Sequence, residues 1–317
     1  MLRFLTRRLL SAIPVLFVVS LVAFGLMWLV PGDIAAEIGG TDATPEDLAA
    51  IRERLGLDKP VWERAVNWYG ALLQGDLGYS YLLNRSVVDA VIERLPVTLS
   101  LAGLSLALAT LTGMLLGILA AVRHNTLLDQ GAMIVALIGL SVPEFWFGIL
   151  MIIMFGVWLG WLPTGGFVPL SEDPVGWARS MVLPAFSLAV SQMGVIARMT
   201  RSAMLDVLGQ DYIRTVRAKG LRARGVVFRH GLPNAMIPIV TVVGVITGVL
   251  LSGAVVIETV FSLPGVGRLI VGAIQRRDFP VVQGGLLVTA GIFVFVNLLV
   301  DVLYAAFDPR VRDGRGG

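Results

Sequence analysis

Six long runs almost free of Asp, Glu, Lys and Arg limit the folds open to this chain more than any other feature. The runs are Leu9–Gly32, Leu95–Val122, Gln130–Ser171 (interrupted only by Glu144), Ser180–Ala197, His230–Ile257 and Phe279–Val300. Each can hold the roughly 20 apolar residues that a helix needs to cross a bilayer. With 56% hydrophobic residues and a mean hydropathy of +0.82, the chain carries more apolar surface than a soluble core hides. An all-α membrane protein is therefore predicted.

Charge decides how often the third run crosses, because its 42 residues could hold one helix or two split at Pro143. A single crossing gives six helices, and the inner segments then carry 15 basic and six acidic residues, against 10 basic and 15 acidic ones outside. Two crossings would place the basic loop Arg198–Arg229 outside. We therefore expect six transmembrane helices with both termini in the cytoplasm. The first run exceeds 20 residues and ends in "WLVPGD" without a small-residue cleavage site, so an uncleaved span is expected there.

The outer loop Asp33–Arg94 is the only sizeable hydrophilic region, and two helices are predicted in it. Thr44, followed by Pro45 and by Asp47, has the pattern of an N-cap, and a second helix is expected to begin near Pro60. The predicted apolar stripes are Leu48, Ile51 and Leu55 in the first helix, and Trp62, Val66, Tyr69 and Leu73 in the second. These helices fit either a cap on the membrane rim or a docking surface for an outside partner.

Several kinds of chemistry are not expected of this chain. It has no cysteine and only two histidines, so neither a metal site nor a catalytic residue is predicted. Neither of its two lysines, Lys59 and Lys219, belongs to a phosphate-binding G-x-x-x-x-G-K-[ST] motif. An ion-coupled carrier usually places several ionisable groups inside its spans, and here Glu144 is nearly alone. We therefore expect a protein that is not an enzyme and that draws energy from a partner if it moves a solute.

A few residues inside the predicted spans are candidates for function. Glu144 should face the bundle interior or a water-filled path, because a carboxylate is costly in lipid. A packing role beside the helix break at Pro143 is equally open. The candidate translocation path consists of Ser141, Glu144, Thr247 and Asn297, each of which also fits a packing role. Close helix packing is predicted at glycines four apart, in the pairs Gly113 and Gly117, Gly156 and Gly160, and Gly244 and Gly248.

The loop that begins at Asp211 reads "DYIRTVRAKGLRARGVVFRHGLP" and gathers many of the arginines. Its apolar Tyr212, Val216 and Ala223 alternate with Arg214, Arg217 and Arg224, which is typical of a short amphipathic helix. Such a helix suits anionic headgroups as well as a groove in a soluble partner.

The spacing within this loop resembles the cytoplasmic E-A-A-x3-G-x9-I-x-L-P loop of ABC importer permeases. Gly220 is followed after nine residues by "HGLP", which starts at His230, while Arg214–Val216 occupy the E-A-A positions. Other words extend the resemblance: "PGD" at Pro31, "GDLGYS" at Gly75, "RLPVTLSLA" at Arg94, "SVPEFWFG" at Ser141, "LGWLPTGG" at Leu159, "IETVFSLPGVGRL" at Ile257 and "DPRVRDG" at Asp308. Over nearly its full length the chain resembles the membrane subunit of dipeptide, oligopeptide and nickel ABC importers.

This resemblance implies a type I importer permease in the prokaryotic cytoplasmic membrane. The implied organisation is an N-terminal tail and first helix (1–32), an extracytoplasmic helical loop (33–94), a five-helix transmembrane domain (95–308) with a cytoplasmic coupling loop (198–233), and a tail (309–317). The implied partners are a second, related permease, two ATPase subunits that bind ATP and Mg²⁺, and an extracytoplasmic binding protein. No cofactor in this chain and no nucleic acid is expected.

The resemblance also assigns residues to the contact with an ATPase subunit. They are Tyr212, Ile213, Arg214, Thr215, Val216, Arg217, Ala218, Lys219, Gly220, Leu221, Leu232 and Pro233. Gly220 would permit a turn or a close approach, and Pro233 would mark a break before the fifth span. The implied cargo is a peptide, with nickel chelates or other small solutes left open. The alternative is an ion-coupled carrier that acts without ATPase partners.

Overall fold

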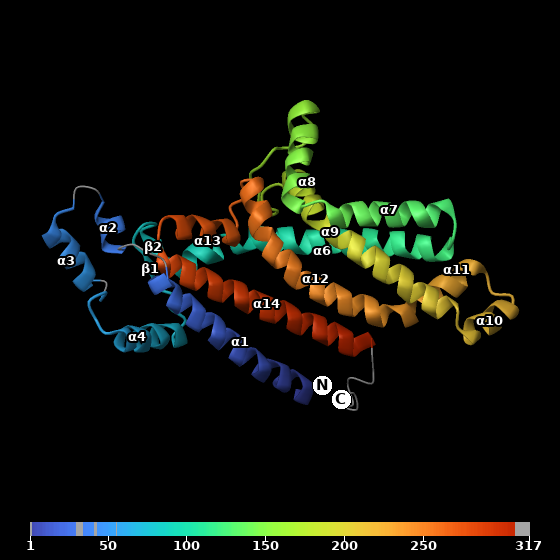
Figure 1. Ribbon diagram of the computed structural model, residues 1–317, viewed down its shortest axis with the longest axis horizontal. Coiled ribbons are helices and arrows are strands. Elements are labelled where there is room, and N and C mark those ends of the chain that lie inside the picture. The colour runs from blue at the N-terminus through green and yellow to red at the C-terminus, as the bar shows by residue number, and fades with distance from the viewer. Residues whose placement is uncertain (1, 30–33, 41–42, 55, 308–317) are drawn as a thin grey trace. The chain divides into compact units, whose positions relative to one another are not determined.

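The computed structural model describes residues 2–29, 34–40, 43–54 and 56–307, and these are mostly helical (Figure 1). The α-helices are α1 (Leu2–Leu29), α2 (Ile34–Gly39), α3 (Pro45–Arg54), α4 (Val61–Leu73), α5 (Val87–Ile92), α6 (Leu95–Val122), α7 (Leu127–Ser141), α8 (Glu144–Met151), α9 (Pro174–Leu208), α10 (Asp211–Ala218), α11 (Ala223–Gly225), α12 (Leu232–Val260), α13 (Val266–Gln275) and α14 (Phe279–Phe307). Two π-helical stretches are η1 (Ile152–Trp158) and η2 (Val226–Gly231). Strands β1 (Tyr79–Ser80) and β2 (Arg85–Ser86) pair antiparallel, with Tyr79 opposite Ser86.

The helices confirm the membrane class predicted from the uncharged runs. Within the described residues, four helical segments are long and apolar enough to cross a bilayer: Val87–Val122, Pro174–Leu208, Ala223–Val260 and Phe279–Val300. The pair Leu127–Ser141 and Glu144–Trp158 forms a further candidate, and the apolar part of α1, Leu10–Leu26, is shorter. The count of six spans and the cytoplasmic placement of both termini therefore remain predictions.

The third uncharged run is divided by a sharp bend. Its two helices are bent by 101°. Val142 between them has extended backbone, with φ −91° and ψ 124°. Pro143 explains the break, because its ring lacks an N–H group and disfavours the helical conformation of the preceding residue. If this run crosses once, as the charge distribution predicts, it does so as a broken helix.

The chain folds into two compact units. Unit 1 comprises Met1–Arg8, Val97–Leu263 and Phe295–Gly317, and unit 2 comprises Leu9–Pro96 and Pro264–Val294. The predicted organisation divides the chain at residues 32 and 94. That organisation remains a prediction; in the structure, the described part of the outer loop belongs to the same compact unit as most of α1 and the segment Pro264–Val294.

Helix α9 is the centre of unit 1, where it packs against α7, α8 and α12. Glycine brings α6 close to it, because a Cβ at Gly113 would lie 2.8 Å from Ile196 Cβ and one at Gly117 would lie 2.5 Å from the Ala197 carbonyl oxygen. The close approach predicted for this glycine pair is confirmed. Gly244 likewise lies against Val300, whereas Gly160 has a φ of +62° and no atom near its missing side chain, so it serves a turn.

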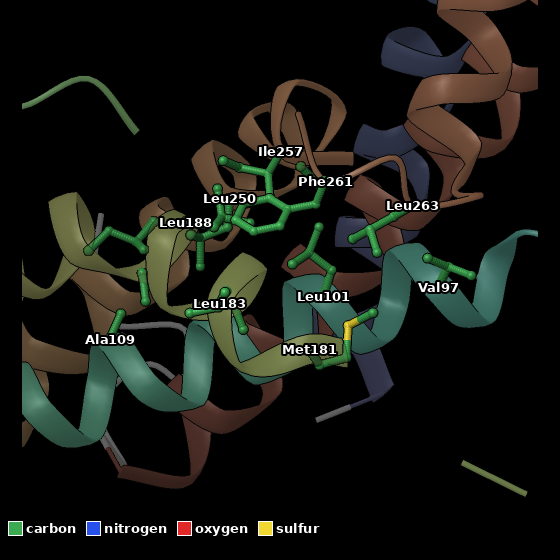
Figure 2. Packing of buried hydrophobic residues seen from close by; sticks show 14 of the residues in the cluster. Val97, Leu101, Ala109, Met181, Leu183, Leu188, Leu250, Ile257, Phe261 and Leu263 are labelled. Atoms are coloured by element: carbon green, nitrogen blue, oxygen red, sulfur yellow. The ribbon is translucent and has the colours of Figure 1, made fainter. Parts of the chain in front are cut away.

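Phe261 joins three of the sequence words within the core of unit 1 (Figure 2). Its side chain is fully buried. Gly148 of "SVPEFWFG" lies beneath its ring, where a Cβ would be 3.0 Å from Phe261 Cε2, and Gly166 of "LGWLPTGG" donates its N–H to the Phe261 carbonyl at 3.2 Å. Gly148 is needed for its small size, and Gly166 for its positive φ of +86°.

Unit 2 contains the two helices predicted in the outer loop. The Thr44 hydroxyl accepts from the Asp47 N–H at 3.2 Å, and the Thr44 N–H donates to Asp47 Oδ2 at 3.0 Å, which confirms the cap. Hydrogen bonds from the Thr44 hydroxyl and amide lower the pKa of Asp47. Leu55 lies outside the described residues. The stripe predicted for α4 is divided, since Tyr69 stacks on Phe17 while Trp62, Val66 and Leu73 are exposed.

Candidate functional site

Helix α10 lies just beyond the end of α9 and forms the tip of the predicted coupling loop (Figure 1). Asp211 in its first turn and Arg217 in its last turn suit the helix dipole. Gly220 follows the C-cap residue Lys219, and its φ of +80° is the left-handed conformation that commonly terminates helices. The predicted amphipathic helix is thus confirmed for Asp211–Ala218, whereas Ala223 begins the next helix.

Two side chains anchor α10 to its own chain. Ile213 is fully buried within the chain, and its contact with an ATPase remains a prediction. The Tyr212 hydroxyl donates to the His230 carbonyl at 3.2 Å and accepts from Asn234 Nδ2 at 3.0 Å. These contacts tie α10 to η2 and to the start of α12, both of which continue into a membrane-spanning helix. Helix α10 is therefore held against η2 and the start of α12.

The rest of the predicted coupling residues offer a surface. Val216 and Leu232 are half-buried, and the remaining ones are exposed: Arg214, Thr215, Arg217, Ala218, Lys219, Gly220, Leu221 and Pro233. Arg214 pairs with Asp211 at 3.2 Å, but the two side chains are 76% and 94% exposed. Such a pair stabilises the fold little. The exposed face of α10 is therefore cationic and available to a partner.

A cavity of about 500 Å³ lies beside this face. Arg217 and Leu221 line it on the side of the coupling loop. Apolar residues form most of the remaining wall: Ala121, Val122, Leu205, Leu208, Val226 and Val227. The cavity can receive an apolar side chain of a partner while Arg217 pairs with an acidic one.

Pro233 does not break the chain's helical path, contrary to the sequence-based expectation. A continuous helical segment runs from Ala223 to Val260, with the π-helical η2 directly before Leu232 and Pro233 in the first turn of α12. The wider π turn accommodates the missing N–H and the ring of proline at this position. Most of the loop predicted for 198–233 is therefore helical. Its first part belongs to α9, and its last part belongs to the helical segment that begins at Ala223.

The ion pair between Arg201 of α9 and Asp129 of α7 was not predicted from the sequence. Arg201 on α9 donates to Asp129 on α7 twice, from Nε to Oδ1 at 2.6 Å and from Nη2 to Oδ2 at 2.8 Å. The Asn125 N–H also donates to Oδ2 at 3.0 Å, and His124 Nδ1 lies 3.3 Å from it. The only local signal was the Thr126-x-x-Asp129 capping pattern, which says nothing of a partner 72 residues away.

The candidate path residues all lie in unit 1, but the structure gives several of them packing contacts. The Ser141 hydroxyl donates to the Leu137 carbonyl at 2.9 Å, and that of Thr247 to the Val243 carbonyl at 2.8 Å. The Glu144 carboxylate rests on α12, where a Cβ at Gly253 would lie 2.6 Å from its Oε1. Asn297 is half-buried on α14. Glu144 therefore brings the bend between α7 and α8 into contact with Gly253 of α12.

A buried polar pair was also missed. Glu258 of α12 is fully buried and accepts a hydrogen bond from Thr98 Oγ1 at 2.6 Å. The sequence places Glu258 directly after an uncharged run, which marked it as a loop residue rather than a core one.

Comparisons with known proteins agree on one family. The model described as "Binding-protein-dependent transport system inner membrane component" matches residues 113–313, and the corresponding N-terminal model matches residues 1–102. A Brucella abortus (strain 2308) protein named as a peptide transport system permease is 49% identical over 306 residues, which cover 96% of this chain and 98% of the relative. The di/tripeptide transport system permease protein DppB of Pseudomonas aeruginosa (strain UCBPP-PA14) is 42% identical, with 99% and 100% of the two chains covered.

A solved structure resembles this fold. The MetNI methionine ABC transporter, in an inward-facing conformation, matches with a TM-score of 0.54 over 67% of this chain and 93% of that chain. The two sequences are 21% identical, so the likeness concerns the fold alone.

Proposed function

Since this chain belongs to the family of binding-protein-dependent transport system inner membrane components, we propose that it is the permease subunit of an ATP-driven importer of di- or oligopeptides. The names of its relatives, which include peptide and di/tripeptide transport permeases, support this cargo. The family does not favour the alternative of an ion-coupled carrier acting alone.

The observation that carries the coupling role is the combination of exposure and support at α10. Its cationic face is open to a partner, while Ile213 and Tyr212 fix its other side to helices that enter the membrane. A partner that moves α10 would move α12 with it, which is how a soluble motor can drive a gate in a membrane protein.

The importer needs partners that this chain does not contain. The sequence lacks a P-loop, so ATP and Mg²⁺ belong to two ATPase subunits, and a second permease would complete the translocation path. An extracytoplasmic binding protein would deliver the peptide. The proposed topology has six spans, the bent α7–α8 pair among them, with both termini in the cytoplasm.

Charge reversal at α10 tests this proposal. In the reconstituted complex, the double change Arg217→Glu and Lys219→Glu is expected to reduce peptide-stimulated ATPase activity about tenfold or more, because like charges across an interface cost several kcal/mol. The control is the charge-conserving exchange Arg217→Lys with Lys219→Arg. Basal membrane insertion should be equal in both variants, since these side chains are exposed.

Unchanged stimulated activity in the charge-reversed complex would contradict coupling at α10. Peptide uptake by the purified single chain in vesicles without ATP would favour the ion-coupled carrier instead.

A further inference from the structure

Helix α4 presents an apolar face to its surroundings. Trp62, Val66 and Leu73 are 68%, 65% and 89% exposed. They lie on one side of the helix together with Tyr69, because residues three, four and seven apart share a helical face. The later part of α4, from Ala65 to Leu73, contains no charged residue. Such a face is unfavourable in water, so it indicates a surface that an apolar partner covers.

The neighbouring part of α4 is held against α1 by aromatic contacts. The ring of Tyr69 stacks on that of Phe17 with centroids 6.5 Å apart, and the rings of Trp68 and Phe24 are 5.4 Å apart. Phe24 is only 8% exposed, so this contact is well packed. Both helices belong to unit 2 over these residues. Two pairs of rings therefore fix the position of α4 along α1.

A chain of hydrogen bonds supports this contact. The Ser20 hydroxyl donates to the Phe17 carbonyl at 2.7 Å and lies 3.1 Å from the Tyr69 hydroxyl. Because the single proton of the serine hydroxyl is used for the carbonyl, the Tyr69 hydroxyl is the donor in the second bond. Ser20 is 4% exposed. The polar end of Tyr69 thus has its partner within the protein, as a tyrosine removed from water needs.

These contacts lie beside the apolar part of α1, Leu10–Leu26. Ser20 precedes Leu26 by six residues, so it lies about 9 Å along the helix from that end. In the predicted topology α1 crosses the bilayer, and Leu26 is near its outer end. Tyr69 then lies at the depth of lipid acyl chains, although it belongs to the loop predicted to be extracytoplasmic.

The exposed side of α1 adjoins the exposed face of α4. Phe17 remains 54% exposed beside Tyr69, and Leu21, one turn further along α1, is 49% exposed. Lipid tails are as apolar as leucine, so such side chains are well accommodated against lipid. Val66 and Leu73 flank Tyr69 on α4. The two helices therefore form one continuous apolar surface.

We propose that α4 lies in the outer leaflet of the membrane and that Trp62, Val66 and Leu73 contact lipid acyl chains. A helix with one apolar and one polar side is suited to the boundary between headgroups and acyl chains, where tryptophan is also enriched. The ion pair between Lys59 and Glu63, at the start of α4, is partly exposed and suits the headgroup side.

Lipid fits this face better than the soluble binding protein does. A partner that docks and leaves would expose three large apolar side chains to water in every cycle, whereas lipid covers them throughout. The later part of α4 also offers no charge that would orient such a partner. The inference concerns the placement of α4 and holds for any cargo, so it does not depend on the proposed peptide transport.

Spin labelling of the full permease complex tests this placement. The complex is reconstituted in nanodiscs of phosphatidylethanolamine and phosphatidylglycerol, with a nitroxide on Val66→Cys, Leu73→Cys or Asn67→Cys. The wild-type chain has no cysteine, so the identically treated wild-type complex gives the background from the other subunits. Asn67 is the matched control, because it is exposed and lies about 100° around the helix from Val66.

The measurement is the collision rate of each label with oxygen, which dissolves in lipid, and with a water-soluble nickel chelate. We expect the ratio of oxygen to nickel collisions at Val66 and Leu73 to exceed that at Asn67 about fivefold or more, because a polar chelate is excluded from acyl chains.

Two results would overturn the proposal. If the nickel chelate reaches the label at Val66 or Leu73 as readily as at Asn67, the face lies in water. If either position excludes both oxygen and the chelate, a protein surface covers the face, such as that of the second permease or the binding protein.

Discussion

Arg201 and Arg214 flank the junction between α9 and α10, and the same side chain has opposite surroundings at the two positions. Arg201 makes two short hydrogen bonds to Asp129, whose side chain is 4% exposed. Arg214 makes one contact of 3.2 Å with an acid that is 94% exposed. A paired charge in a buried site is costly to break, while an exposed pair contributes little. The first arginine therefore fixes α9 to α7, and the second remains available for binding.

The largest expected effect comes from breaking the buried pair. Asp129→Ala leaves the Arg201 guanidinium without its carboxylate, so we expect the free energy of unfolding to fall by about 3 kcal/mol. Thermal unfolding of the purified permease complex measures this loss. Asp211→Ala is the matched control on the exposed pair and should cost less than about 1 kcal/mol. Equal melting temperatures for the two variants would remove the distinction between the arginines.

A second substitution tests the contact between α9 and α6. Gly117→Leu forces a side chain against the Ala197 backbone, and overpacking of this kind costs about 1–3 kcal/mol. The same change at Gly103, on the same helix, meets no atom within 4 Å and should be close to neutral. Denaturant titration of the two variants compares them directly. A neutral Gly117→Leu variant would contradict the close contact of α6 with α9.

The smallest expected effect is on the exposed side. Arg214→Ala should change stability by no more than about 0.5 kcal/mol, because the side chain is 76% exposed and its ion pair is a surface pair. The same thermal unfolding assay measures it, with Arg201→Ala as the contrasting variant. If Arg214→Ala lowers the stability as much as Arg201→Ala does, the Arg214 side chain stabilises the fold and the expected contrast between the two arginines is wrong.

The features that followed from the sequence are local ones. The cap at Thr44, the helix at Asp211–Ala218 and the close approach at Gly117 depend on residues within one or two turns, or on the small size of one residue. The features that were missed involve partners far apart in the chain. The Asp129 pair joins residues 72 apart, and the Thr98 hydrogen bond to Glu258 joins residues 160 apart. Neither partner has a local pattern that identifies the other.

The burial of Ile213 shows the same limit inside a predicted site. An amphipathic pattern states that one side of α10 is apolar, but not whether that side meets a partner or the chain itself. The structure answers this for Ile213, which packs inside unit 1, and leaves Leu221 exposed beside a cavity.

The sequence by itself determined the membrane class, the position of the basic loop between two spans, and the family spacing from Gly220 to Pro233. Those properties depend on hydropathy, charge and order along the chain, which are present before folding. The tertiary structure alone decided that Arg201 is held in a buried ion pair while Arg214 stays exposed, and how "SVPEFWFG", "LGWLPTGG" and "IETVF" meet at Phe261. Each of these depends on long-range packing, because the side chains involved become neighbours only when distant helices come together.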